Sequence, residues 1–227
     1  MAYTTIDDPS EYFDVDIYTG TGSSHARTLN FKPDWLWSKA RDEAYNHILI
    51  DSSRGTNKGI FSDVSNAEAT NSAYLSSFNS DGYTLSSIAN NNGNGTSFVT
   101  WAWKANGGTT ASNSSGSNGA EADSVYQVNN TAGFSIGTYT GGGGGTFNIA
   151  IYTGLSAACE AVIVKNRDAA KDWAVGFGEK VSTSAARYLS LNNNDAAKSV
   201  GGNSSERQQG ALNLNNFGAG LFDVTSG

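Results

Sequence analysis

Two stretches decide how this chain folds, FKPDWLWSKAR at Phe31–Arg41 and CEAVIVKNR at Cys159–Arg167. Each holds a short apolar run, typical of a β-strand, that ends in a Lys-x-Arg pair. A similar turn precedes each of them, Tyr-Thr-Gly-Thr-Gly from Tyr18 and Tyr-Thr-Gly-Gly-Gly from Tyr139. The sequence therefore predicts that one strand–turn–strand unit occurs twice.

The beginnings of the two copies match at a constant spacing. The eight residues from Phe134 follow the eight from Phe13 at a shift of 121, and Phe, Tyr, Thr and Gly recur at the same places. The first copy ends with FVTWAWKA at Phe98–Ala105, which has no counterpart in the second. We therefore expect the second unit to be incomplete, with one strand edge left open. A neighbouring chain is one way to close this edge, and a polypeptide that continues beyond Gly227 is the one we favour.

The composition favours an all-β protein. Only 15% of the 227 residues are charged, well below the roughly 25% of an ordinary soluble domain, and Gly, Ser, Asn and Thr take their place. The 27 glycines and two prolines indicate turns made by glycine, and Asp81-Gly82 is a typical hairpin step. Strand-like segments follow one another with almost no helix-periodic sequence between them, which is typical of a β-sandwich.

We expect four segments along the chain. Residues 1–12 form an extended arm, 13–105 a first β-sandwich unit, 106–124 a linker and 125–227 a second unit. The linker is the clearest boundary, because Asn106–Asp123 has no large apolar residue and is rich in Gly, Ser and Asn. The predicted fold is therefore two tandem all-β sandwich units, the second of them incomplete.

Charge and hydropathy argue against several partners. A net charge of −7 disfavours nucleic acid, because no excess of basic groups is available to bind phosphate. No run approaches the ~18 apolar residues of a membrane-spanning helix, and the first residues do not resemble a signal peptide. We therefore expect no membrane partner and synthesis in a cytoplasm. The single cysteine, Cys159, is interpreted as a small buried hydrophobe.

Catalytic and metal-binding patterns are absent from the sequence. The seven Glu are scattered, so no carboxylate pair of a glycosidase is recognisable. His47 and Asp51 could share a strand face, but no Gly-x-Ser-x-Gly elbow accompanies them, and we interpret His47 as structural. The other imidazole is His25, and no metal-ligand spacing occurs. We expect no enzymatic activity, no cofactor and no metal, and a jelly-roll glycosidase is the least favoured alternative.

Several positions have two interpretations. Asp14 and Asp16 alternate with apolar residues and suggest either a cation site or an acidic solvent face, of which we favour the acidic face. On the next strand, residues 35–41, the side chains of Trp35, Trp37, Lys39 and Arg41 share one face. They suit either a core strand that emerges at the rim, which we favour, or a platform that stacks on a sugar.

Two loops rich in small residues are interpreted as flexible tips. Gly141–Gly145 resembles a phosphate cradle, but no Gly-Lys-Ser/Thr follows it, so a hairpin tip is favoured. Asn90–Thr96 is the other expected tip.

An ordered set of motifs resembles a domain family of bacteriophages, especially marine ones. The motifs are Tyr-Thr-Gly-x-Gly, Phe-x-Pro-Asp-x-x-Trp-x-Lys-x-Arg, Asn-His-x-Leu-x-Asp-Ser-x-Arg-Gly, Phe-x-Ser-Asp-Gly-Tyr-Thr-Leu and Phe-Val-x-Trp-Ala-Trp-Lys-Ala. They stand at Tyr18–Gly22, Phe31–Arg41, Asn46–Gly55, Phe78–Leu85 and Phe98–Ala105. The resemblance implies concanavalin A-like jelly-roll sandwiches in tandem, carried on phage structural or fibre-like proteins, and brings no catalytic residues with it.

We therefore expect a non-enzymatic virion structural protein, a tail-fibre-like component or a capsid decoration, assembled in the cytoplasm of a bacterial host. Its expected partners are other virion proteins and copies of itself. The arm, with Tyr3, Ile6 and Pro9, is the predicted docking element. The alternative is a lectin-like module that binds a host-surface glycan and acts as a receptor-binding protein. Its candidate carbohydrate-binding residues are Tyr18, Lys39, Arg41 and Tyr139.

Overall fold

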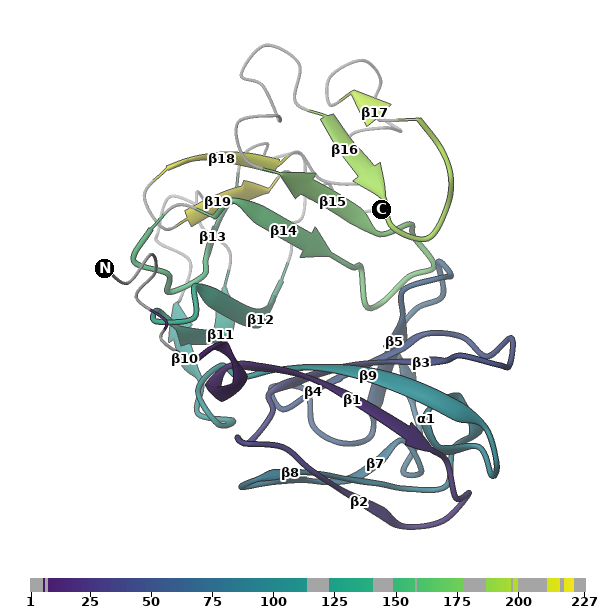
Figure 1. Cartoon of the computed structure of the whole chain (residues 1–227). Coiled ribbons are helices and arrows are strands. Elements are labelled where there is room, and N and C mark those ends of the chain that lie inside the picture. Colours follow the sequence, from purple (N-terminus) through teal and green to yellow (C-terminus); the bar gives the residue numbers. More distant parts are fainter. Residues whose placement is uncertain are drawn as a thin grey trace. The chain divides into compact units, whose positions relative to one another are not determined.

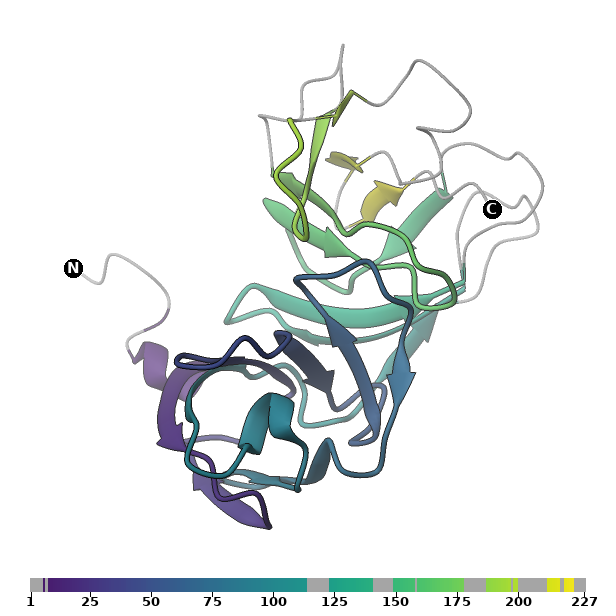
Figure 2. The same ribbon diagram turned by 90° about the vertical axis from the view of Figure 1, so that its right-hand side faces the viewer.

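The computed structural model of this chain describes residues 6, 8–113, 123–140, 149–157, 159–177, 187–196, 198–199, 212–216 and 219–222. Secondary structure in this part is almost entirely β, and its helical elements are the 3₁₀ turn η1 (Pro9–Glu11) and the one-turn helix α1 (Ala89–Asn92) (Figure 1, Figure 2). This confirms the predicted all-β class.

The chain divides into two compact units. The first comprises Met1–Thr109 with Thr131–Phe134, and the second Thr110–Asn130 with Ser135–Gly227. The division after Thr109 falls inside the segment predicted as a linker. Part of that segment forms strand β10 (Ala111–Asn113), which pairs with β11 (Ser124–Asn129) and so belongs to a sheet.

The first unit is a sandwich of two antiparallel sheets. The larger has six strands in the order β1-β9-β3-β4-β5-β6, and the smaller has three in the order β2-β8-β7. The hairpin of β7 and β8 turns at Asp81-Gly82, as the sequence predicts. The strands are β1 (Phe13–Thr19), β2 (His25–Thr28), β3 (Trp35–Ala40), β4 (Ile48–Asp51), β5 (Lys58–Phe61), β6 (Ala69–Thr70), β7 (Leu75–Asn79), β8 (Gly82–Leu85) and β9 (Ser97–Trp103).

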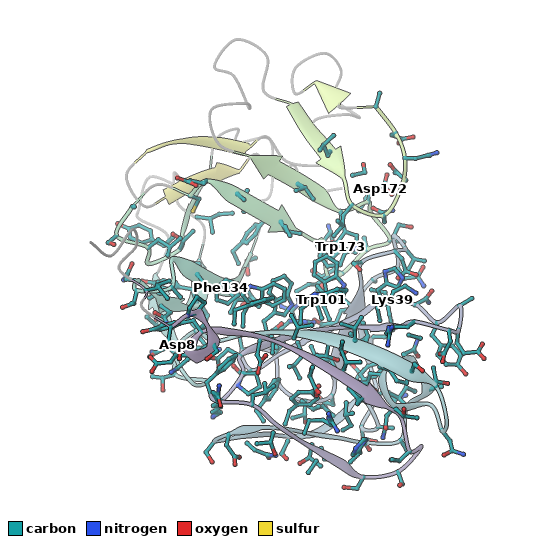
Figure 3. All side chains as sticks on the ribbon, viewed as in Figure 1. Asp8, Lys39, Trp101, Phe134, Asp172 and Trp173 are labelled. Carbon is teal, nitrogen blue, oxygen red and sulfur yellow. The ribbon has the colours of Figure 1, made fainter. Side chains whose placement is uncertain are left out.

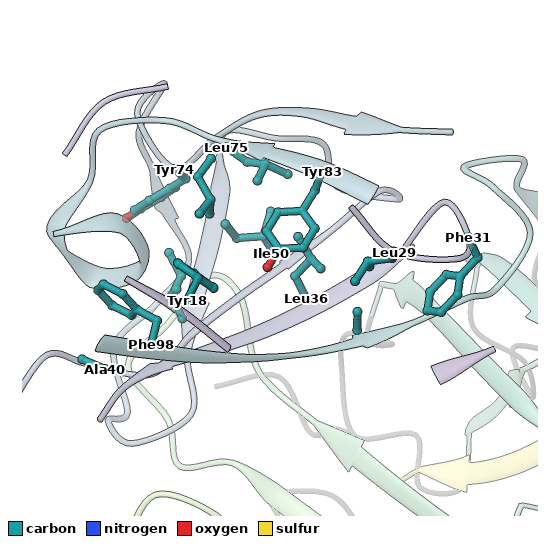
Figure 4. Packing of buried hydrophobic residues seen from close by; sticks show 13 residues of the cluster. Tyr18, Leu29, Phe31, Leu36, Ala40, Ile50, Tyr74, Leu75, Tyr83 and Phe98 are labelled. Carbon is teal, nitrogen blue, oxygen red and sulfur yellow. The ribbon is translucent and has the colours of Figure 1, made fainter. Parts of the chain in front are cut away.

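The core lies between the two sheets. Alternate residues of a strand point to opposite sides of a sheet, and on β3 and β9 the inward positions include Leu36, Ala40, Phe98 and Ala102. Each of these is at most 2% exposed, and Tyr83 of the smaller sheet is fully buried beside them (Figure 4). The tryptophans occupy the other face, which is half-buried, so the favoured interpretation of them as core residues is wrong.

The inward face of β1 carries its polar residues. Phe13, Val15 and Ile17 point outward and are 36%, 42% and 61% exposed. Asp16 points into the sandwich, where its carboxylate accepts hydrogen bonds from Arg27 of β2 at Nε (2.8 Å) and Nη2 (2.6 Å). The prediction of an acidic solvent face is therefore wrong for Asp16, because the guanidinium supplies the charge partner that a buried carboxylate requires.

The segment expected to be a flexible tip, Asn90–Thr96, is instead a packed element that begins in α1. Asn91 and Asn92 are 1% and 0% exposed. The Asn92 amide donates to the Ser23 carbonyl (2.6 Å), and its Oδ1 accepts from the Thr21 backbone N–H (2.9 Å). Asparagine at this position thus ties the turn after β1 to the turn before β9, because its side chain both donates and accepts.

The Pro33-Asp34 step fixes the end of the central strand β9. The Asp34 carboxylate is fully buried and accepts from the backbone N–H groups of Ala105 (2.7 Å) and Gly107 (2.9 Å). Its other oxygen accepts from the Ser52 hydroxyl. One side chain therefore joins the entry to β3, the exit of β4 and the exit of β9, which are far apart in the sequence.

The second unit repeats the strand order of the first. The sheet β14-β15-β16-β17 corresponds to β3-β4-β5-β6, and β13-β19-β18 corresponds to β2-β8-β7. The strands outside the β10–β11 hairpin are β12 (Phe134–Tyr139), β13 (Ile149–Tyr152), β14 (Ala161–Val164), β15 (Ala174–Phe177), β16 (Arg187–Ser190), β17 (Lys198–Ser199), β18 (Leu212–Asn216) and β19 (Ala219–Phe222).

The strand register repeats as well. Trp35 pairs with Asp51 in the first unit, and Ala161 pairs with Phe177 in the second, a shift of 126 residues on both strands. The remaining pairs of the two ladders keep this shift. The internal repeat that the sequence predicts therefore extends to individual hydrogen-bonded pairs.

The two units differ at the position of β9. In the first unit β9 pairs with β1 along one edge and with β3 along the other. In the second unit β12 pairs with β11 and β14 pairs with β15, and within the described residues no strand joins β12 to β14. The open edge that the sequence predicts is present on β14 in this part of the chain.

Replacing Gly20 by alanine is expected to lower the free energy of unfolding by about 1–3 kcal/mol, because the added methyl group would overlap the Gly93 carbonyl and the Phe98 ring. Ser24→Ala, an exposed change in the same turn, should stay within about 0.5 kcal/mol of wild type. Urea unfolding measures both. Equal stabilities of the two variants would contradict the close approach at Gly20.

Candidate functional site

The clearest surface feature of the first unit is a row of aromatic side chains on the outer face of the six-stranded sheet. We call it the aromatic face and define it as Phe13, Trp35, Trp37, Trp101 and Trp103. The strand register creates it, because Phe13, Trp103 and Trp35 are successive cross-strand neighbours, as are Val15, Trp101 and Trp37. Side chains that face each other across strands lie close enough to pack, so the five rings form one surface.

The rings of the aromatic face touch in sequence. Trp103 lies 5.0 Å from Phe13 and 4.4 Å from Trp35, centroid to centroid. Trp37 lies 5.9 Å from Trp35 and 6.0 Å from Trp101, in a stacked and an edge-on arrangement respectively. These spacings are typical of favourable aromatic pairs.

Polar groups border this apolar surface. The indole N–H of Trp37 donates to the Ser62 hydroxyl (3.0 Å), which fixes the ring orientation. Lys39 continues the row beyond Trp37, opposite Val99, and its ammonium donates to the Ala40 carbonyl (2.8 Å). Figure 3 labels Trp101 and Lys39 on this side of the sheet. Phe134, which belongs to the first unit, stacks on Trp35 at 5.8 Å with the rings within 8° of parallel.

The four predicted carbohydrate-binding residues do not form one site. Tyr18 is 6% exposed and its hydroxyl donates to the Asn91 carbonyl (2.6 Å), so its ring is not available for stacking on a sugar. Lys39 lies on the aromatic face, and Arg41 is exposed just beyond β3. Tyr139 belongs to the second unit and is half-buried, and this burial raises the pKa of its phenol.

The lysines of the two Lys-x-Arg pairs have equivalent structural contacts. Lys165 donates to the carbonyl of Asn166 at 2.8 Å, as Lys39 does to that of Ala40. Lys165 also donates to the Lys171 carbonyl, and its partial burial lowers its pKa to about 8. Both lysines therefore stabilise the end of a strand, a role that the sequence pattern alone does not reveal.

The predicted docking arm is only partly described. Tyr3 lies outside the described residues, and Ile6 is half-buried. Pro9 begins the 3₁₀ turn η1, whose first residues are capped by the Asp8 carboxylate (2.9 Å to the Ser10 N–H). The arm is therefore turned rather than extended over Pro9–Glu11.

A cluster of polar side chains lies inside the sandwich of the first unit, and the sequence analysis missed it. Asp16 accepts from the Tyr83 hydroxyl (2.8 Å) in addition to Arg27, and the guanidinium lies 4.9 Å from the Tyr18 ring. The signal in the sequence was the alternation of Asp with apolar residues in β1. It could be interpreted correctly only with the position of Arg27, which lies on another strand.

The histidine considered for catalysis is separated from its expected partner. Asp51 is bound by the buried Arg54 guanidinium, which also contacts Glu68 at 2.9 Å. Burial lowers the His47 pKa, the charge of Asp63 opposes this shift and the charge of Lys39 adds to it. This arrangement agrees with a structural role for His47.

The described residues contain no group of three or more His, Cys, Asp and Glu side chains placed to hold a metal ion. In the same part of the chain, no helix has the length and hydropathy needed to cross a membrane.

Comparison with known families assigns most of the chain to one of them. Residues 8–221 match the profile of a domain of unknown function, DUF7483. The chain belongs to the DUF7483 family. The match covers both units, so the DUF7483 domain comprises the duplicated arrangement as a whole. No curated protein and no solved structure matches the chain.

The buried phenol of Tyr83 predicts alkaline sensitivity of this DUF7483 domain. Burial raises the Tyr83 pKa well above its ordinary value, and the neighbouring Tyr18 and Asp16 add to the shift. The unfolded chain releases this proton near pH about 10, whereas the folded chain keeps it, so the unfolded state binds fewer protons above that pH. The free energy of unfolding should therefore fall as the pH rises above about 10.

Urea unfolding across this pH range measures the effect. Tyr83→Phe should be less stable at neutral pH by about 1–3 kcal/mol, since Asp16 loses a donor, but its stability should fall less steeply above pH about 10. If the free energy of unfolding fell equally steeply with pH in the two proteins, the alkaline sensitivity could not be assigned to Tyr83.

Proposed function

We propose that this chain is a non-enzymatic structural protein of a bacteriophage particle, either fibre-like or attached to the capsid as a decoration. In this proposal the sandwiches are concanavalin A-like jelly rolls, and the arm that includes Tyr3, Ile6 and Pro9 docks the chain onto other virion proteins. The motif set that resembles phage proteins is the starting point, and the positions of the motif residues in the fold support the assignment.

One observation carries the proposal: the polar motif residues hold the fold together. The Asp34 carboxylate joins the ends of three strands. The Asp51 carboxylate and the Arg54 guanidinium, both about 5% exposed or less, bind each other beneath the turn after β4. The Asp81-Gly82 step turns a hairpin. Residues used in this way suit a protein whose task requires stability, because leaving one charge of a buried pair unpaired costs about 3–5 kcal/mol.

The proposal predicts that the chain is part of the particle. Peptides from both units should be found by mass spectrometry of density-purified particles from the producing culture. The copy number relative to the major capsid protein distinguishes a fibre from a decoration. Presence of the chain in the lysate together with its absence from purified particles would refute the proposal.

A second candidate function is binding of a host-surface glycan, and the aromatic face favours it. The flat apolar faces of sugar rings stack on aromatic rings, and hydroxyl groups find donors and acceptors such as Lys39 at the border. The low charge density of the chain also suits a neutral ligand. A virion protein with such a surface would contribute to attachment to the host.

Titration with host polysaccharide, followed by tryptophan fluorescence, tests this second function. Trp101→Ala should weaken binding at least about tenfold, equivalent to about 1.4 kcal/mol, because one ring of the aromatic face, on the middle strand β9, is lost. Tyr18→Phe is the control and should bind as wild type does, since Tyr18 is buried. Unchanged affinity of Trp101→Ala, or no fluorescence change at millimolar sugar, would exclude the aromatic face as the glycan site.

A further inference from the structure

The edge of β14 is the feature of the second unit that no assigned role explains. β14 pairs with β15 along one edge, and no described strand pairs with its other edge. An unpaired edge exposes a row of backbone N–H and C=O groups that readily pair with another strand. Ile163, near the middle of β14, is 40% exposed, so an apolar side chain accompanies the unpaired backbone.

The first unit shows what belongs at this edge. Because β14 and β15 keep the register of β3 and β4, β14 is the counterpart of β3 residue by residue. The free edge of β3 is filled by β9, which pairs with it over six residues from Trp35 to Ala40. The second unit therefore contains β14, the counterpart of β3. Its described residues contain no counterpart of β9.

The inward residues of β3 are more buried than those of β14, as expected because β3 has a neighbouring strand, β9, on the edge that is unpaired in β14. Leu36 and Ser38 on β3 are 2% and 3% exposed. Their counterparts Val162 and Val164 on β14 are only half-buried. A further strand beside β14 would cover these two valines, and burying apolar surface stabilises by about 25 cal/mol per Å².

A hollow of the second unit lies beside the end of β12, where the Asp123 carbonyl accepts from the Thr140 backbone N–H (3.0 Å). In the first unit Ser97, which begins β9, pairs with Thr19 and accepts from the Arg41 backbone N–H (2.7 Å). The counterparts of Thr19 and Arg41 are Thr140 and Arg167, and both line a hollow of about 300 Å³ in the second unit. Its other lining residues are Ser112, Asp123, Ser124, Val125, Thr138 and Tyr139.

We propose that the open edge of β14 is a docking site for a β-strand donated by a separate partner protein. The strand that fits is uncharged and extended, about as long as β9, with small or β-branched residues at the positions that face Val162 and Val164. This chemistry follows from β9, whose inward residues opposite β3 include Thr100 and Ala102. Backbone hydrogen bonds would supply the affinity, and the alternating side chains the specificity.

The sequence of β9 is the probe that the chain itself provides. A synthetic peptide SFVTWAWK, residues 97–104, with added lysines for solubility, is mixed with the full chain. Hydrogen exchange is then measured on the backbone amides of β14. With the peptide at 100 times its dissociation constant, the edge amides of β14 should exchange about 100-fold more slowly. The amides of β3 are the internal control and should not change, because β9 already occupies their edge.

Joining the peptide covalently to the chain makes the test independent of the affinity of the free peptide. The same eight residues are joined to the C-terminus of the full chain through a Gly/Ser linker of about 20 residues, which reaches roughly 25 Å. The fusion should protect β14, and the same fusion with proline in place of the central threonine should not, because proline breaks the strand.

Two outcomes would overturn the proposal. One is a fused chain whose β14 amides exchange as fast as those of the proline control, which would show that the edge accepts no strand of this kind. The other is protection of β14 that increases with protein concentration in the absence of peptide, which would identify a second copy of the chain as the occupant.

Discussion

The structure of the first unit depends on β9, which forms hydrogen bonds along both of its edges. It joins β1, from the beginning of the unit, to β3, which continues into the rest of the sheet. The same strand divides the unit into a buried side, with Phe98 and Ala102, and a half-buried side, with Trp101 and Trp103. Without this strand, β1 would lose its partner and the sheet would end at β3.

Buried charges accompany this architecture and set its orientation. Asp16 and Arg27 bind each other inside the sandwich, with side chains 8% and 23% exposed. A carboxylate removed from water is tolerated when its oxygens are fully hydrogen-bonded, and here Arg27 and Tyr83 meet that requirement. The pair therefore turns the apolar residues of β1 outward, where they extend the aromatic face.

The two units share a strand ladder but differ in the surfaces that they present. The ladder of β3 with β4 in the first unit corresponds to the ladder of β14 with β15 in the second. In each unit a lysine side chain donates to the backbone carbonyl of the next residue. Tryptophans occur only in the first of the two ladders, because Ala161 and Ile163 stand where Trp35 and Trp37 stand. The first unit thus offers a surface suited to stacking, and the second an edge suited to strand pairing.

The sequence by itself determined the all-β class, the Asp81-Gly82 hairpin and the internal repeat, because these follow from local alternation, turn residues and motif spacing. It did not determine which face of each strand is buried. Asp16 lies inside because Arg27 and Tyr83, which come from other strands, bind it, and the tryptophans of β3 and β9 lie on the half-buried face. Asn92 is buried for the same kind of reason, since its partners Thr21 and Ser23 are about 70 residues away. A period of two reveals that a strand has two faces, but only tertiary contacts decide which of them meets the core.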